Sequence, residues 1–263
     1  MTMAMGAPSS DEVMTIAASR ALRDRAVCFV GIGLPSTAAN LARRTHAPHV
    51  VLVYESGTIG AMPTRLPLSI GDPELAETAL SVVSVPEIFN YWLQAGRIDV
   101  GFLSAAQIDC YGNLNSTVIG PYERPLVRLP GAGGAPEIAG ACKEVIIVLR
   151  QSRRTFVEKL AFVTSVGYMG GPGDRGALGL RGKGPRLVIT DLGLLRPNPG
   201  TCRLELTHLH PGVTLEQAKA ATGWDLEVSP QLAYTDPPTS LELSALRKLA
   251  ATLAGNKPRE EPR

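Results

Sequence analysis

The stretch AVCFVGIGLPS (residues 26–36) holds a strand, a turn and the start of a helix. Residues 26–30 are all apolar and predict a buried strand. Gly31 and Gly33 predict a tight turn, and Ser36 is a candidate N-cap for a helix that continues to about Arg44. This stretch therefore predicts a strand that runs through a short loop into a helix.

The same kind of unit recurs along the chain. Apolar runs predict strands at residues 49–54, 97–103, 143–149 and 186–190, with a short strand at 81–83 and a β-arm at 202–207. Capping boxes predict helices after Ser9, Ser84, Thr214 and Thr239. The pattern predicts an α/β fold with an open, largely parallel (mixed) sheet and helices on both faces. We expect residues 1–263 to form a single domain with a frayed tail at about 256–263.

Composition and charge exclude several classes of function. The formal net charge is +2 and the 19% of charged residues form no basic block, so we expect no binding to nucleic acid or to a membrane surface. No apolar run approaches the roughly 20 residues of a membrane span, and the N-terminus lacks a signal-peptide pattern, which predicts a cytoplasmic protein. The four cysteines lie far apart without nearby histidines, so we expect reduced thiols and no metal site.

Glu55 stands at an unusual place. It follows residues 51–54, which favour a strand, and it precedes Ser56 and Gly57. Ligands bind beyond the carboxyl ends of parallel strands, so a carboxylate at this position is expected to project into the binding crevice. The alternative is a structural glutamate that is solvated or paired with an arginine such as Arg65.

Two loop segments contain further candidate residues. Residues 105–141 form a long loop-like stretch rich in Gly, Asn and Pro, which we expect to be ordered and functional, and it includes Gln107 and the turn at residues 131–136. The turn at Gly31 and Gly33 does not continue as G-x-G-x-x-G and no Walker lysine follows, so nucleotide binding is not supported. There is no G-x-S-x-G elbow for a hydrolase, and His208 with His210 lacks a third metal ligand.

These segments resemble, in the same order, the motifs of one enzyme family. Residues 54–57 (YESG) resemble the SENG signature of class I coenzyme A transferases, and residues 30–35 (VGIGLP) resemble the glycine turn of their β-subunit. Residues 106–117 (AQIDCYGNLNST) and 131–135 (GAGGA) are similar to the glutaconate CoA-transferase β-subunit group. The resemblance extends from about Asp11 to Leu249, and Ser56 replaces the Asn of the broader signature, as in the glutaconate branch.

The resemblance implies a class I CoA-transferase-like fold and a covalent mechanism. It implies that Glu55 is the catalytic residue, which carries CoA as a glutamyl thioester, with succinyl-CoA as donor and 3-oxoadipate as acceptor in the most similar branch of the family. The oxyanion and CoA-binding candidates are backbone and polar groups of Gly31, Gly33, Ser56, Gly57, Gln107, Gly131, Gly133 and Gly134. No metal and no redox cofactor is implied, because the CoA thioester is itself the substrate.

The resemblance also implies a partner. The glycine-rich motif of the family's α-subunit is not found in this sequence, so we expect a hetero-oligomer with an α-subunit, with two copies of each chain or more. Two other functions stay open: transfer to glutaconate or another dicarboxylic acid, and hydrolysis or decarboxylation of a CoA thioester on the same fold. The hydrolases and decarboxylases of the family lack a glutamate at this position, so the presence of Glu55 favours transfer.

Overall fold

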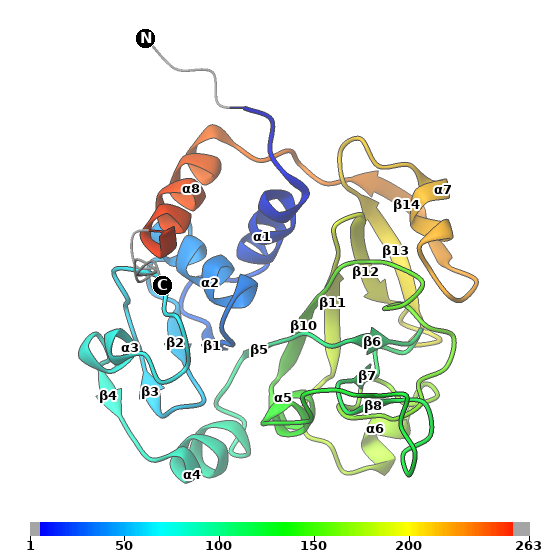
Figure 1. Cartoon of the computed structure of the whole chain (residues 1–263), viewed down its shortest axis with the longest axis horizontal. Helices are drawn as coiled ribbons and strands as arrows, with labels where there is room; N and C mark the ends of the chain where they lie inside the picture. The colour runs from blue at the N-terminus through cyan, green and yellow to red at the C-terminus, as the bar shows by residue number, and fades with distance from the viewer. Residues whose placement is uncertain (1–5, 255–263) are drawn as a thin grey trace, which may run out of the picture.

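The computed structural model describes residues 6–254, and a ten-stranded sheet runs through this part of the chain (Figure 1). The strands of this sheet are β1 (Val27–Phe29), β2 (Val51–Val53), β3 (Thr58–Ile59), β4 (Ser81–Val82), β5 (Val100–Leu103), β10 (Glu144–Val148), β11 (Pro185–Ile189), β12 (Gly193–Pro197), β13 (Leu204–Leu209) and β14 (Glu227–Tyr234). Two separate hairpins pair β6 (Gln107–Ile108) with β7 (Leu114–Asn115) and β8 (Val118–Ile119) with β9 (Val127–Arg128). The tail expected at 256–263 lies outside the described residues.

Helices connect these strands. They are α1 (Ser10–Arg20), α2 (Leu34–Arg44), α3 (Pro73–Glu77), α4 (Val85–Glu87), the π-helical turn η1 (Ile88–Leu93), α5 (Ala135–Ala141), α6 (Asp174–Ala177), α7 (Leu215–Ala220) and α8 (Ser240–Ala254). The capping box predicted for the first helix is confirmed, since Glu12 N–H donates to Ser9 Oγ and Ser9 N–H donates to Glu12 Oε2. These reciprocal bonds satisfy two amide groups that the first turn of a helix leaves free.

The centre of the sheet is parallel, as the sequence predicts. Strands β11, β10, β5, β1 and β2 lie side by side in that order and run in the same direction, while β12, β3 and β4 add antiparallel pairs at the sides. After β1 the chain moves outward to β2, whereas after β5 it moves to β10 on the other side. The winding therefore reverses between β1 and β5, and ligands bind at such a reversal, beyond the carboxyl ends of the strands.

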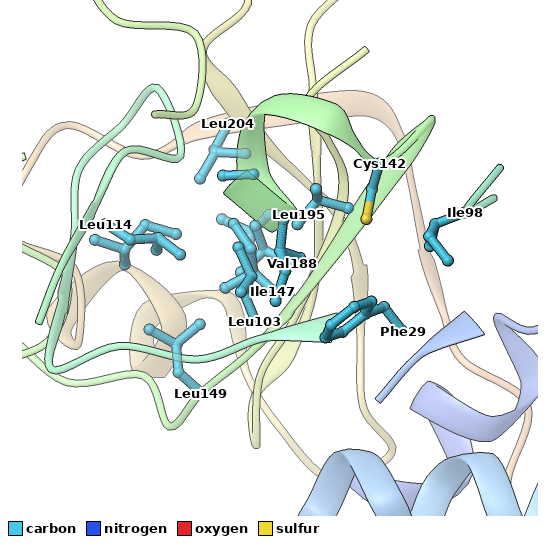
Figure 2. Close-up of a cluster of buried hydrophobic side chains, with 14 of the residues drawn as sticks. Phe29, Ile98, Leu103, Leu114, Cys142, Ile147, Leu149, Val188, Leu195 and Leu204 are labelled. Carbon is cyan, nitrogen blue, oxygen red and sulfur yellow. The ribbon is translucent and has the colours of Figure 1, made fainter. Parts of the chain in front are cut away.

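Helices cover both faces of the sheet, which confirms the predicted layers. Buried residues of α1 and α2 pack with Leu52 and Ile146 on one face, where α8 lies beside α1 and α2 (Figure 1). Residues of α5 and η1 pack on the other face. Figure 2 shows part of this second cluster, with Ile147, Val188 and Leu195 from three neighbouring strands close together. The two layers hold the strand ends rigidly in register.

Three local expectations are wrong. Helix α2 begins at Leu34, so Ser36 is not its N-cap but a buried residue whose Oγ lies 3.2 Å from Tyr54 Oη. Residues 105–141 are ordered, as expected, but they are not one long loop, because they form the two hairpins and α5. The segment predicted as an arm belongs to β13, which lies inside the main sheet between β12 and β14.

None of the helices within residues 6–254 is long and apolar enough to cross a membrane.

Candidate active site

Glu55 lies in the tight turn between β2 and β3, directly after the carboxyl end of a parallel strand. Tyr54 N–H donates to Thr58 O at 3.0 Å, and Gly57 N–H donates to Tyr54 O at 3.0 Å, which fixes the turn. Gly57 has φ +109°, and a Cβ atom at this position would lie 2.0 Å from Val83 O. Only glycine fits there, so Gly57 shapes the turn that presents Glu55.

The Glu55 carboxylate has no protein partner in the described part of the chain. Its side chain is half-buried, and no residue within 6–254 gives it a hydrogen bond or an ion pair. Arg65 instead donates two hydrogen bonds of 2.7 Å to Asp72, so the alternative that Arg65 neutralises Glu55 is wrong. A half-buried carboxylate without a partner has no evident structural role, which favours a chemical one.

The start of α5 lies against Glu55. A Cβ atom built on Gly134 would lie 3.1 Å from Glu55 Oε1 and 2.7 Å from Phe89 Cζ. Gly134 therefore allows close approach of the backbone to the carboxylate, as the glycines of this segment predict. Phe89 belongs to η1, so three distant segments of the sequence meet at Glu55.

The glycine turn at the end of β1 is next to the Glu55 turn. Phe29 is paired with Val53, and Val30 N–H donates to Val53 O at 2.9 Å, so the two turns leave the sheet at the ends of adjacent parallel strands. No described residue accepts a hydrogen bond from the backbone N–H groups of Gly31, Gly33 or Ser56. Gly33 has φ +87° and lines a hollow of about 150 Å³ between this turn and residues 66–68. Free backbone amide groups are the kind of donor that an oxyanion site uses.

Gln107 and the Gly131 turn are held by neighbouring residues of one hairpin. Asn115 Nδ2 donates to Gln107 Oε1 at 2.9 Å, and the next residue, Ser116, accepts the Gly131 N–H at 2.8 Å and donates its own hydroxyl to Gly131 O. The amide groups of Gly57 and Gly131 are thus used within the protein, whereas those of Gly133 and Gly134 have no acceptor in the described residues. The expected CoA-binding segment is therefore ordered, and its ligand contacts stay a prediction.

Two features of this site were not predicted from the sequence. Phe89 reaches Glu55 from a π-helical turn, and its local pattern indicated only an amphipathic helix after the Ser84 cap. The hydroxyls of Ser56 and Thr58 are buried without a hydrogen-bond partner in the described structure, on either side of Gly57. Such orphaned groups are uncommon in proteins and collect at functional sites.

The other reactive side chains lie elsewhere. Within residues 6–254, no three His, Cys, Asp or Glu side chains are close enough together to hold a metal ion. Burial raises the pKa of the Cys28 and Cys142 thiols, which keeps them protonated and unreactive. His210 is buried between Thr190 O and Thr235 Oγ1, where burial lowers its pKa. Glu55 is thus a half-buried carboxylate at the strand ends that has no partner among the described residues.

The fold and this carboxylate define a class of enzyme, and comparison with known proteins agrees. The coenzyme A transferase family model matches residues 12–221, so the chain belongs to this family. It is 62% identical over 250 residues to the β-subunit of the 3-oxoadipate CoA-transferase of Pseudomonas knackmussii, covering 95% of this chain and 96% of that protein. It is also 37% identical to the β-subunit of the glutaconate CoA-transferase of Acidaminococcus fermentans, over 87% of this chain and 88% of the relative.

Solved structures give the same result for the fold. The crystal structure of glutaconate CoA-transferase from Acidaminococcus fermentans matches with a TM-score of 0.86 and 32% identity, over 92% of this chain and 94% of that one. The decarboxylase AibA/AibB matches with a TM-score of 0.79 and 25% identity, over 91% and 93% of the two chains. The predicted class I CoA-transferase-like fold is therefore confirmed.

Proposed function

We propose that this chain is the β-subunit of an enzyme that transfers CoA from succinyl-CoA to 3-oxoadipate, with Glu55 as the covalent carrier of CoA. The observation that carries this proposal is the 62% identity, over nearly the whole chain, to a protein named as a 3-oxoadipate CoA-transferase. The structure adds a half-buried carboxylate that has no structural partner within the described residues and stands at the carboxyl end of β2. The identity supports the reaction, and the unpartnered carboxylate supports Glu55 as the residue that carries CoA.

The first half-reaction forms the glutamyl thioester. A Glu55 oxygen attacks the thioester carbonyl carbon of succinyl-CoA, the carbon–sulfur bond breaks, and CoA leaves as a thiolate from a mixed anhydride. The thiolate then attacks the Glu55 carbonyl carbon of that anhydride. Succinate leaves with one carboxylate oxygen taken from Glu55, and Glu55 holds CoA through a new carbon–sulfur bond.

The second half-reaction runs these steps in reverse with a different acid. A carboxylate oxygen of 3-oxoadipate attacks the glutamyl thioester and expels the thiolate, which then attacks the 3-oxoadipyl carbonyl of the anhydride. The products are 3-oxoadipyl-CoA and a regenerated Glu55 carboxylate. Thioester energy is conserved throughout, so this mechanism needs no metal and no redox cofactor, and it predicts ping-pong kinetics.

Each attack produces a tetrahedral oxyanion that the site must stabilise. The free amide groups of Gly31, Gly33 and Ser56 are the donors that we assign to this role, and removal of one such donor typically raises the barrier by about 3 kcal/mol. The free amides of Gly133 and Gly134, with Gln107, are assigned to the CoA or substrate side. Gly57 and Gly131 support these groups through the shape of their turns.

The α-subunit is the partner that we infer. The two relatives compared above are each named as one subunit of a CoA-transferase. In this chain Leu80, just before the edge strand β4, Val82 on β4 and Val85 on α4 are exposed. Val83 N–H donates to Gly57 O at 2.9 Å, so this apolar edge is bonded directly to the Glu55 turn. We propose that the α-subunit covers this edge in an assembly of two copies of each chain.

Two alternatives differ in the fate of the thioester. Similarity to a glutaconate CoA-transferase favours another dicarboxylic acid as acceptor, and 26% identity to the cholesterol ring-cleaving hydrolase IpdB subunit of Mycobacterium tuberculosis favours hydrolysis. Transfer to a second acid requires a carboxylate carrier, which Glu55 supplies. Measuring transfer to a panel of acceptor acids tests the first alternative. Measuring the release of free CoA without an acceptor tests the second.

The decisive experiment traps the carrier. The chain is co-expressed with its α-subunit, succinyl-CoA is added without an acceptor, and the peptide that contains Glu55 is analysed by mass spectrometry for a CoA adduct. We expect an adduct on Glu55 in the wild type and none in Glu55→Ala, with a loss of 3-oxoadipate-dependent turnover. If no adduct forms and Glu55→Ala keeps full turnover, the proposed function is wrong.

A further inference from the structure

The side chain of Phe89 ends beside the Glu55 carboxylate. A Cβ atom on Gly134 would lie 2.7 Å from Phe89 Cζ, 2.9 Å from Phe89 Cε1 and 3.1 Å from Glu55 Oε1. Phe89 Cζ and Glu55 Oε1 therefore both lie close to the one point beside Gly134 where a side chain would begin, so the ring and the carboxylate are near neighbours.

The π-helical turn holds Phe89 in this place. Gln94 N–H donates to Phe89 O at 2.8 Å, a bond that spans five residues rather than four. Ile88 and Leu93 at the two ends of η1 are fully buried, and the Phe89 ring packs on Phe29, with 6.2 Å between ring centroids. Phe89 itself is half-buried, between the core and the site. Single π-helical turns occur often at functional sites.

An apolar ring at this position has a chemical consequence if Glu55 becomes a thioester, as the proposed function requires. Water that reached the acyl carbon of Glu55 would form a bond through its oxygen, the carbon–sulfur bond would break, and the thiolate would take a proton to give free CoA. Glu55 would be regenerated as a carboxylate, and the net reaction would be hydrolysis of succinyl-CoA. Excluding water from this carbon protects the transfer reaction.

We propose that Phe89 is a positioning residue that fixes the Glu55 side chain and keeps water away from its acyl carbon, so that it decides between transfer and hydrolysis. This role rests on the proposed function of Glu55. It is separate from the oxyanion donors, because Phe89 supplies no hydrogen bond and acts only by shape and exclusion of water. Loss of the ring should therefore change the ratio of two outcomes more than the rate of the first attack.

The test measures that ratio in the complex with the α-subunit. Release of free CoA from succinyl-CoA without an acceptor gives hydrolysis, and formation of 3-oxoadipyl-CoA gives transfer. We expect Phe89→Ala to raise the ratio of hydrolysis to transfer by about tenfold and Phe89→Leu, which keeps much of the apolar volume, to raise it less. Tyr91→Ala is the matched control, because Tyr91 is an aromatic residue of the same turn but is 63% exposed.

The outcomes separate this inference from the proposed function. A raised ratio in Phe89→Ala, with the wild-type ratio in Tyr91→Ala, supports the role of Phe89. An unchanged ratio, an equal fall in hydrolysis and transfer, or the same rise in Tyr91→Ala overturns it while Glu55 keeps its role. If Phe89→Ala does not assemble with the α-subunit, Phe89→Leu decides by the same ratio. Failure of the wild type to form a Glu55 adduct overturns the proposed function, and this inference with it.

Discussion

Two carboxylates in neighbouring loops of this chain differ in nearly every contact. Asp72 accepts two hydrogen bonds of 2.7 Å from Arg65, one from Leu68 N–H at 2.9 Å and one from Glu74 N–H at 3.1 Å. The Arg65 guanidinium holds the pKa of Asp72 at about 2. Glu55 is only half-buried and accepts no hydrogen bond from any residue in the range 6–254. One carboxylate is saturated by its surroundings, and the other is left free.

This difference is the one that we expect between a structural carboxylate and a reactive one. A nucleophile must have an oxygen atom that is free to attack. Both carboxylate oxygens of Asp72 already accept hydrogen bonds that hold its loop, so Asp72 is a poor nucleophile. The Glu55 turn keeps unbonded amide groups and orphaned hydroxyls beside its carboxylate, which weakens local structure. Rigidity there is supplied by the constrained Gly57 within the turn and by α5 and η1 outside it. This contrast leads to predictions about which residues change activity and which change stability.

Removal of the free carboxylate should give the largest effect. We expect Glu55→Gln to lower kcat/KM for CoA transfer by at least about 10⁴-fold, because an amide cannot form the anhydride. The free energy of unfolding should change by less than about 0.5 kcal/mol, since no described group depends on the Glu55 charge. Steady-state kinetics and urea unfolding of the same preparation check both values. A large loss of stability would show that Glu55 has a structural partner after all.

Arg175 tests whether the Glu55 site depends on a buried side chain whose hydrogen bonds hold α5 in place. It is buried, and its guanidinium donates to Gly182 O, Gly167 O and Ala139 O, so it ties the glycine-rich segment at residues 167–184 to α5. We expect Arg175→Met to lower the free energy of unfolding by about 3 kcal/mol or more, because several buried carbonyl groups lose their donor.

The matched control for this experiment is Arg181→Met. Arg181 is exposed and makes one hydrogen bond, to Gln94 O at 3.0 Å, so its loss should cost less than about 0.5 kcal/mol. Urea unfolding compares the two variants. Since α5 begins next to Glu55, Arg175→Met should also lower the yield of the Glu55–CoA adduct, and equal stability of both variants would contradict the role of Arg175.

Substitution of Gly134 tests the close approach between the start of α5 and the Glu55 carboxylate. In Gly134→Ala the new Cβ atom would meet Phe89 Cζ at 2.7 Å and Glu55 Oε1 at 3.1 Å, so the ring or the carboxylate must move. We expect kcat for transfer to fall by about 10- to 100-fold, with a smaller change in KM for succinyl-CoA. Gly133→Ala is not a neutral control because Gly133 has φ +50°. Gly176→Ala is suitable, since no atom lies near its added Cβ, and it should keep wild-type kinetics.

The sequence predicts the central fold well because buried parallel strands have a strong local signal. The apolar runs at β1, β2, β5, β10 and β11 all appear as neighbouring parallel strands. The strands outside this parallel centre were predicted less well, since β3, β12 and β14 were missed. Strand β14 has few buried residues, and its pairing with β13 depends on a contact between distant segments rather than on a local pattern.

For the site, the sequence predicts positions along the chain better than contacts in space. Glu55 was placed at the end of a strand from the apolar run before it and Gly57 after it, and the structure confirms that place. The approach of Phe89 and Gly134 to its carboxylate could not be predicted, because it arises from the packing of η1 against α5. The choice of π-helical over α-helical hydrogen bonds in η1 has no clear sequence signal either.

Substitution of Asp72 should give the smallest effect. In contrast to Glu55, it should change stability and leave activity nearly unchanged. We expect Asp72→Asn to lower the free energy of unfolding at pH 7 by about 1 to 2 kcal/mol, with transfer kinetics nearly unchanged. Because the folded-state pKa of Asp72 is about 2 and the ordinary value is 3.8, its stabilisation is complete above about pH 4 and is lost as the pH falls toward 2. Urea unfolding between pH 6 and pH 2 should therefore show the two curves converging at low pH. The control is Asp11→Asn, which breaks an exposed ion pair with Arg150 and should change the free energy of unfolding by less than about 0.5 kcal/mol. Stability curves for Asp72→Asn and the wild type that stay parallel down to pH 2 would contradict the role of Asp72.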